Sequence, residues 1–173
     1  GRTTAERRAL AEFASGKSLG AAFSIVPPAS AMCRPSAPSA SGGARWSGFG
    51  QNASNMRFQP AAAAGIPASD VPRLKLKWAF GFEGDISAFS QPTVIGNQVF
   101  IGSAGGVVHA LRADSGCLQW TFQAGGSIRS AIVAVPLEGR YFLLFGDLTG
   151  WFYALDAATG KEMWRKRPEE HEA

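Results

Sequence analysis

A pattern of glycine, alanine, leucine and tryptophan occurs twice in this chain with the same internal spacing. Gly102, Gly106, Ala110, Leu111, Gly116 and Trp120 return 44 residues later as Gly146, Gly150, Ala154, Leu155, Gly160 and Trp164. Short aromatic and aliphatic runs, such as residues 141–145 and 151–155, lie between the glycines. Such runs are typical of strands that are buried on both faces. A repeat of this length, made of short strands and glycine turns, predicts the four-stranded blade of a β-propeller.

Each copy of the repeat also predicts a turn followed by an outer strand. Residues 113–116 and 157–160 end in glycine, which reaches positive φ without a Cβ clash. An indole on the following strand buries roughly 150–250 Å² and can fill the gap between adjacent blades. We therefore expect structural docking by a set of three tryptophans and two glycines: Trp78, Trp120, Trp164, Gly116 and Gly160. The alternative, core aromatics of an ordinary antiparallel sandwich, stays open.

Residues 154–164, which read ALDAATGKEMW, resemble the tryptophan-docking motif of quinoprotein propellers, the family of pyrroloquinoline quinone (PQQ) dehydrogenases. The copy at residues 110–120 is less regular. Three upstream segments, residues 46–50, 55–59 and 71–78, resemble the start of that family's propeller, and most closely that of the polyvinyl-alcohol dehydrogenase type. The resemblance covers about residues 46–171. It implies an all-β fold, a partial β-propeller.

The expected organisation of the propeller part follows from the repeat. Residues 46–80 form a lead-in segment with an orphan outer strand at 74–80, because no inner strands precede it. Two four-stranded blades follow at residues 81–124 and 125–167, and residues 168–173 begin a further blade. Propellers close with typically 4–8 blades. We therefore expect the chain to be a fragment that is inactive when isolated.

The residues before the propeller have a different composition. Residues 1–17 predict a short helix, since Thr3 and Glu6 fit a capping box and Gly16 can end the helix. This helix resembles the end of a cytochrome c domain. Residues 18–45 are rich in proline, serine and alanine and are predicted to be a disordered linker. A disulfide between Cys33 and Cys117 stays open. The chain has no Cys-x-x-Cys-His motif, so haem c would belong to a missing upstream domain.

Charge and hydropathy exclude several classes of function. The formal net charge of +4 comes from dispersed residues, whereas a nucleic-acid surface needs basic and exposed aromatic residues on one face. No apolar run of about 18 residues is present, so no membrane span is encoded. The residues also assemble no hydrolase triad or metal cluster.

The resemblance implies PQQ and calcium near the axis of a complete ring, against innermost strands expected at residues 87–94 and 127–133. The glutamate typical of alcohol-oxidising members is replaced near Phe89, and no adjacent cysteine pair follows Trp120. Arg129 is the remaining candidate for cofactor binding, because its planar guanidinium can bridge two quinone oxygens. The alternative is an arginine on a rim loop. We expect His109 to lie on a strand face and His171 to be solvated.

Two functions stay in view. The first is a periplasmic PQQ-dependent alcohol or polyol dehydrogenase, similar to the polyvinyl-alcohol enzymes, that passes electrons to cytochrome c and needs the missing remainder of the propeller as its partner. The second is a non-catalytic propeller scaffold for protein–protein interaction, resembling outer-membrane assembly propellers. The missing glutamate and cysteine pair favour the scaffold, and the lead-in segment favours the enzyme.

Overall fold

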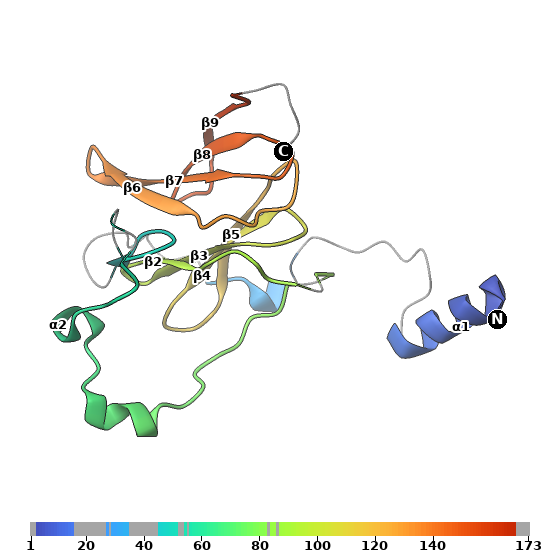
Figure 1. Cartoon of the computed structure of the whole chain (residues 1–173), viewed down its shortest axis with the longest axis horizontal. Coiled ribbons are helices and arrows are strands. Elements are labelled where there is room, and N and C mark those ends of the chain that lie inside the picture. Colours follow the sequence, from blue (N-terminus) through green and yellow to red (C-terminus); the bar gives the residue numbers. More distant parts are fainter. Residues whose placement is uncertain are drawn as a thin grey trace.

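Two antiparallel sheets, consecutive in sequence, form the centre of the computed structural model (Figure 1). The first sheet has the order β1-β2-β3-β4-β5 and the second the order β6-β7-β8-β9. Their strands are β1 (Arg45–Trp46), β2 (Thr93–Ile95), β3 (Gln98–Gly102), β4 (Val107–Arg112), β5 (Leu118–Gln123), β6 (Val133–Leu137), β7 (Arg140–Gly146), β8 (Phe152–Asp156) and β9 (Glu162–Lys166). The structure describes residues 3–15, 27, 29–34, 45–51, 54, 56–82, 84–85 and 87–168.

The fold class predicted from the repeat, an all-β partial propeller, is confirmed. Within each sheet the last three strands pair with their neighbours in the expected order. The two sheets also share an irregular strand pairing that the sequence pattern does not predict. The register shifts between Ala110 and Leu111 in the first sheet and between Ala154 and Leu155 in the second, which are the same positions of the repeat. The two sheets are therefore two copies of one structural unit.

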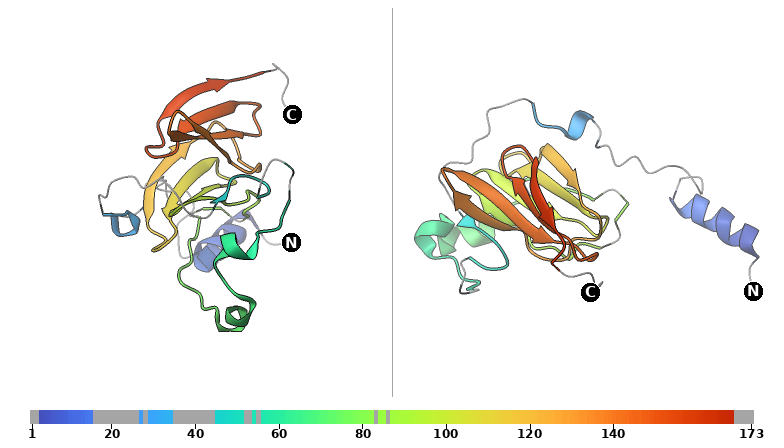
Figure 2. Two further views of the ribbon diagram at one scale, coloured as in Figure 1. Left: turned by 90° about the vertical axis from the view of Figure 1, so that its left-hand side faces the viewer. Right: turned by 90° about the horizontal axis from the view of Figure 1, so that it is seen from above.

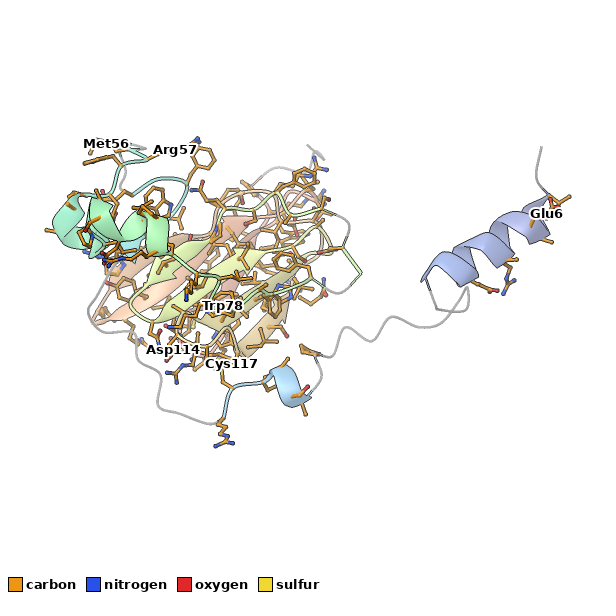
Figure 3. All side chains as sticks on the ribbon, turned by 90° about the horizontal axis from the view of Figure 1, so that it is seen from below. Glu6, Met56, Arg57, Trp78, Asp114 and Cys117 are labelled. Atoms are coloured by element: carbon orange, nitrogen blue, oxygen red, sulfur yellow. A yellow bond between two sulfur atoms is a disulfide. The ribbon has the colours of Figure 1, made fainter. Side chains whose placement is uncertain are left out.

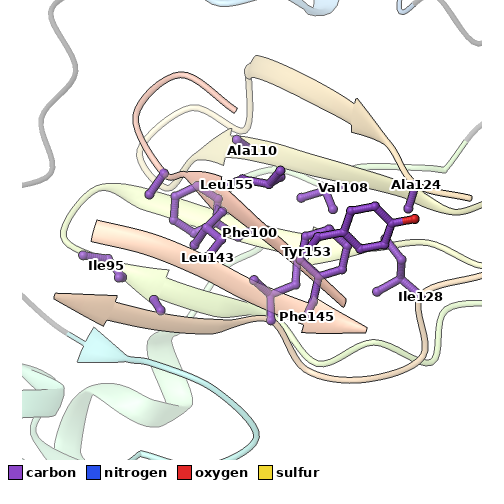
Figure 4. Close-up of a cluster of buried hydrophobic side chains, with 13 residues drawn as sticks. Ile95, Phe100, Val108, Ala110, Ala124, Ile128, Leu143, Phe145, Tyr153 and Leu155 are labelled. Atoms are coloured by element: carbon purple, nitrogen blue, oxygen red, sulfur yellow. The ribbon is translucent and has the colours of Figure 1, made fainter. Parts of the chain in front are cut away.

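The hydrophobic core lies where the two sheets face each other (Figure 4). Phe100 of β3 and the aliphatic side chains of β4 share this core with side chains of β7 and β8, and it includes a group of aromatic rings. In that group the rings of Phe145 and Tyr153 stack with centroids 5.1 Å apart, and Phe122 of β5 approaches Tyr153 edge-on at 5.7 Å. Phe100, Val108, Leu143 and Leu155 are completely buried. The contact between sheets is thus a packed interior.

The first sheet has five strands, where the sequence predicted a four-stranded blade. The extra strand is β1 in the lead-in segment, which pairs through Arg45 and Trp46 with β2. The carbonyl of Ser47 then accepts a hydrogen bond of 2.9 Å from the amide of Ala134 in β6. The start of the lead-in segment therefore crosses the inner edges of both sheets and joins them.

The innermost strands begin later than expected. β2 starts at Thr93 and β6 at Val133, whereas the sequence predicted strands from residues 87 and 127. The residues before them instead make contacts between the sheets: the Ser90 hydroxyl donates to the carbonyl of Ser130 at 2.8 Å. The Thr93 hydroxyl donates to the carbonyl of Ile132. Hydrogen bonds between the sheets are thus made just before β2, by Ser90, and at its first residue, Thr93.

The orphan segment at residues 74–80 pairs with no strand among the described residues. Before it, the lead-in segment forms a four-residue helix α2 (Ala61–Ala64) and the 3-10 helix η2 (Ala68–Arg73), neither of which the sequence pattern indicated. From η2 the chain returns to the first sheet in an extended conformation (Figures 1 and 2). The contact of this segment with the sheet is made by side chains, described below.

The N-terminal helix α1 (Thr4–Ser15) starts with the predicted capping box. The amide of Glu6 donates to the Thr3 hydroxyl at 3.3 Å, and the amide of Thr3 donates to the Glu6 carboxylate at 2.7 Å. The predicted stop at Gly16 lies outside the described residues.

The structure differs from the expected disordered linker at residues 29–34. Here the 3-10 helix η1 (Ala29–Ala31) precedes a parallel bridge from Met32 to Leu118 of β5. The amide of Cys33 donates to the carbonyl of Leu118 at 2.8 Å, and Cys33 forms a disulfide with Cys117. This covalent link answers the question that the sequence left open.

Candidate functional site

Two tryptophans dock on the two glycine turns in the same way. The Nε1 of Trp78 donates to the carbonyl of Ala113 at 3.0 Å, and the Nε1 of Trp120 donates to the carbonyl of Ala157 at 3.2 Å. Ala113 and Ala157 are the same position of the repeat. Trp78, from the unpaired orphan segment, thus docks on a turn of the first sheet in the same way as Trp120 of β5 docks on a turn of the second sheet.

Glycine is required at the end of both turns for two reasons. Gly116 and Gly160 have φ of 72° and 70°, values that residues with a side chain rarely adopt. A Cβ at Gly116 would also lie 2.6 Å from the ring of Trp78, and one at Gly160 would lie 2.5 Å from that of Trp120. Trp164, the third tryptophan of the set, is 44% exposed on β9. Its side chain is therefore available to a further surface.

Arg129 lies in the connection between the sheets, with its guanidinium carbon 4.7 Å from the ring centroid of Phe89. Both side chains are exposed. A cation over an aromatic face is attracted by the ring quadrupole. From the sequence, Arg129 is predicted as a cofactor-binding candidate and Phe89 as the replacement of a glutamate, and the structure brings the two side chains together.

Strand pairing shows that Phe89 and Arg129 hold equivalent places. Thr93 pairs with Phe100, and Val133 pairs with Leu144 at the matching position of the repeat. Phe89 lies four residues before Thr93, and Arg129 lies four residues before Val133. The spacing of this inner part is 40 residues and not 44. A search at constant offset therefore misses the correspondence.

Arg129 also borders a cavity of about 560 Å³ on the second sheet, together with apolar residues such as Leu144 and Phe152. Asp147 lies in the same border. Its carboxylate accepts hydrogen bonds from the Tyr153 hydroxyl at 2.8 Å and from the Thr149 hydroxyl at 2.8 Å. Burial pushes the pKa of Asp147 up, but these bonds and those from the backbone bring the pKa below its ordinary value. The carboxylate of Asp147 is thus charged, and hydrogen bonds hold it at the β7–β8 turn.

His109 lies on β4, as expected for a residue of a strand face. It is 9% exposed, and the edges of Phe80 and Phe82 approach its ring at 5.3 and 5.2 Å. Burial lowers the pKa of His109, while Asp85 and backbone groups oppose this shift. His171 lies outside the described residues.

The residues that the structure describes include no group of three or more His, Cys, Asp or Glu side chains able to hold a metal ion. Among the same residues, no helix has the length and apolar character needed to cross a membrane. The fit to an acidic quinone is therefore partial: Arg129 offers a cation and Phe89 a flat apolar face, whereas a calcium ligand is absent from this pair.

Sequence comparison finds two polyvinylalcohol dehydrogenases, from a Pseudomonas species and from Sphingopyxis sp., each 42% identical over 125 residues. The match covers 70% of this chain but 19% and 18% of these relatives. A 1-butanol dehydrogenase (cytochrome c) from Thauera butanivorans is 29% identical over 134 residues and 19% of its length. The chain thus spans about a fifth of the curated relatives that it matches.

A family model described as outer membrane protein assembly factor BamB matches residues 104–172. Two solved structures of quinohemoprotein alcohol dehydrogenases share the fold. The one from Comamonas testosteroni has a TM-score of 0.55 at 23% identity, covering 71% of this chain and 19% of that one. The enzyme ADHIIG from Pseudomonas putida has a TM-score of 0.59 at 20% identity, covering 73% and 19%. The similarity to quinoprotein dehydrogenase propellers of the polyvinyl-alcohol type is confirmed.

Proposed function

We propose that this chain is part of a PQQ-dependent alcohol dehydrogenase that oxidises secondary alcohols or polyols such as polyvinyl alcohol and passes the electrons to cytochrome c. The 42% identity to two polyvinylalcohol dehydrogenases supports the substrate class. The printed name of the 1-butanol relative, which includes cytochrome c, supports the electron acceptor. The remainder of the propeller is the partner that such an enzyme requires.

The observation that carries the proposal is the stack of Arg129 on Phe89, which come from the segments before β6 and β2. A guanidinium held on an aromatic face keeps its N–H groups directed outward, toward acidic oxygens of a ligand. In this proposal Arg129 binds the cofactor's oxygens and Phe89 holds Arg129 in place. PQQ itself would accept the hydride from the alcohol. Because Phe89 carries no oxygen, ligands for calcium would come from outside this pair.

The docking residues have a separate part in this proposal. Trp78 and Trp120 join each sheet to what precedes it, and the exposed Trp164 is positioned to dock on a turn of a following sheet. A site at the axis needs all sheets of the ring. We therefore expect the isolated chain to have no dehydrogenase activity.

A periplasmic location fits the disulfide between Cys33 and Cys117, since stable disulfides are formed in oxidising compartments such as the periplasm. Helix α1 would then be the end of an upstream cytochrome c-like domain, and residues 18–45 the linker to the propeller. That domain is where haem c would be attached in this proposal.

A second candidate function is a protein-binding scaffold without a quinone. The match of residues 104–172 to the assembly-factor family model favours it, and so does the phenylalanine at position 89. The two candidates differ in one observable property, the binding of PQQ.

The test uses a protein that contains this chain and has the full length of its relatives. It is titrated with PQQ in the presence of calcium, bound quinone is followed by absorbance, and dye reduction is assayed with pentane-2,4-diol. The enzyme proposal predicts quinone absorbance and turnover. Absence of both would support the scaffold.

The role of Arg129 is tested with Arg129→Met, with Arg140→Met as a matched control because Arg140 also lies over a ring, that of Phe142. We expect PQQ affinity to fall about 10- to 100-fold for Arg129→Met, the range for a hydrogen bond to a charged group. Arg140→Met leaves it unchanged. Equal affinities of the two variants would contradict the role of Arg129.

A further inference from the structure

Two serines lie next to the contact between Arg129 and Phe89. Ser90 follows Phe89 directly in the chain, and Ser130 follows Arg129 directly. The two serines hold equivalent places, because each lies three residues before the start of an innermost strand, β2 or β6. The contacts that hold these serines therefore also set where the side chains of Phe89 and Arg129 start.

Each serine is tied to its own sheet at the same position of the repeat. The amide of Gly102 donates to the Ser90 hydroxyl at 3.3 Å. The Ser130 hydroxyl donates to the carbonyl of Gly146 at 3.2 Å. Gly102 and Gly146 are the first glycines of the two copies of the repeat. The hydrogen of the Ser130 hydroxyl is thus used within the second sheet.

Ser90 joins the two sheets as well. Its hydroxyl donates to the carbonyl of Ser130 at 2.8 Å, while the same oxygen accepts the bond from the amide of Gly102. A serine hydroxyl has one hydrogen and two lone pairs, which permits both bonds at once. Ser90 is 6% exposed, so little water competes for these bonds. The Ser90 side chain is therefore a buried link between the segment of Phe89 and the segment of Arg129.

The residue before Arg129 is also held to the first sheet. The amide of Ile128 donates to the carbonyl of Ser103 at 3.1 Å, and the Ile128 side chain is completely buried. A Cβ on Gly102 would clash with the Ile128 side chain and would lie 3.3 Å from the Ser90 hydroxyl, so this glycine lets both segments come close. Arg129 is thus an exposed residue between two anchored neighbours. Of these two anchors, the one made by Ser90 depends on a side chain.

We propose that Ser90 is a positioning residue for Arg129. Its hydroxyl fixes the segment before β2 against the segment before β6, and the guanidinium thereby stays on the ring of Phe89. Without this hydroxyl the anchor at Ile128 remains, but the anchor at Ser130 is lost and the guanidinium leaves the ring for part of the time. The effect on PQQ binding rests on the proposed function, whereas the effect on the contact between Arg129 and Phe89 does not.

Thr93 supplies a matched control for this role. Its hydroxyl also joins the sheets, by donating to the carbonyl of Ile132, and Thr93 is completely buried. Thr93→Val removes this hydroxyl and keeps the shape of the side chain, as Ser90→Ala removes the hydroxyl of Ser90. The two variants therefore lose the same kind of bond between the sheets, one of them beside Arg129 and the other farther along both segments.

The first measurement follows the contact by NMR in this chain, without quinone. Arginine is labelled with carbon-13, the δ-protons of Arg129 are assigned by their absence in Arg129→Met, and Phe89→Leu gives their position without the ring. We expect Ser90→Ala to move the Arg129 signal toward that position and Thr93→Val to leave it in place. Should Ser90→Ala fail to fold, Ser90→Cys, whose thiol is a weak donor, takes its place. An unmoved Arg129 signal, or equal shifts in the Ser90 and Thr93 variants, would overturn the proposal.

The second measurement is the PQQ affinity of the full-length protein that contains this chain, with calcium present. We expect Ser90→Ala to weaken binding about two- to tenfold, the net value of one hydrogen bond, and Thr93→Val to leave the affinity unchanged. In the Arg129→Met background, Ser90→Ala should weaken binding no further, because Ser90 acts through Arg129. Additive losses would overturn the proposal. If the wild-type protein binds no PQQ, the proposed function fails, and the NMR comparison in this chain still decides the role of Ser90.

Discussion

The two docking turns of the molecule accept the same indole contact from different kinds of segment. Trp120 comes from β5, a strand that pairs with β4 over its length with one register shift. Trp78 comes from residues 74–80, which pair with no strand in the described part of the chain. Both indoles nevertheless donate to the equivalent carbonyl and lie against the equivalent glycine. The docking geometry is therefore set by turn and tryptophan, and ladder pairing is not needed for it.

The first turn has an additional link that the second lacks. Cys117, next to Gly116, is bound to Cys33, so that Trp78 and the disulfide lie at the same end of the first sheet (Figure 3). Position 161, the counterpart of Cys117, is a lysine. The disulfide and the bridge from Met32 to Leu118 hold residues 32–33 to the end of the first sheet where Trp78 docks.

The largest expected effect is that of Trp120→Ala. The indole packs on Phe100 with centroids 5.8 Å apart and lies between the sheets, so its loss should lower the free energy of unfolding by about 3–5 kcal/mol. Trp78→Ala should cost less, because its segment lacks a ladder and Leu76 beside it is 85% exposed. Urea denaturation followed by circular dichroism measures both. Equal losses would mean that strand pairing adds nothing to the docked indole.

Removal of the disulfide sharpens the comparison from the other side. Cys33→Ser combined with Cys117→Ser opens a link across a sequence separation of 84 residues and should lower the free energy of unfolding by about 2–4 kcal/mol. Limited proteolysis should then cut near residue 34, while the second sheet stays protected. Unchanged stability, or cleavage first in the second sheet, would argue against a local role of the link.

The glycines of the two turns come next in size. Gly160→Ala forces an unfavourable φ, at about 1–2 kcal/mol, and moves the ring of Trp120. Gly116→Ala should cost a similar amount, since its φ and its distance to Trp78 are nearly the same. Thermal melts of the two variants measure the difference. The control is Gly139→Ala, which has positive φ but no atom within 4 Å of the added Cβ.

The smallest expected effect is the dependence of stability on pH through His109. Because burial lowers its pKa, the folded chain binds a proton there more weakly than the unfolded chain. The contribution of His109 to the free energy of unfolding is complete above about 6.5, the pKa of histidine in the unfolded chain. It is lost as the pH falls from there toward the lower pKa of His109 in the folded chain. The urea midpoint should therefore fall between pH 7 and 5 more steeply in the wild type than in His109→Gln. The pKa of Asp147 is lowered from 3.8, so Asp147 acts only at more acidic pH.

The sequence predicts the parts of this fold that repeat. The positions of β3, β4, β5 and of β7, β8, β9, with the turns between them, follow from glycines and tryptophans at a fixed offset. β1 is missed because two residues give no periodic signal, and its pairing with β2 is a contact over some fifty residues. The helices α2 and η2 are missed because tertiary context decides such short turns.

The candidate site was only half visible in the sequence. Arg129 could be recognised as an arginine after two glycines, and Phe89 as the residue that replaces a glutamate. Their contact could not be predicted, because the inner segments repeat after 40 residues and the rest of the pattern after 44. The disulfide was left open because Cys33 lies in a segment whose composition suggests disorder. The ring contacts of His109 with Phe80 and Phe82 were missed because these two residues belong to the end of the lead-in segment and the residues after it, which carry no repeat.

The most direct test of the docking account is a double-mutant cycle between Trp78 and Gly116. Unfolding free energies are measured for Trp78→Ala, Gly116→Ala, the double variant and the wild type. If the indole lies against the glycine, removal of the ring relieves the clash of the added methyl group, and the two losses are less than additive by about 1–3 kcal/mol. Additive losses, within a few tenths of a kcal/mol, would show that Trp78 does not dock on this turn and would contradict the account.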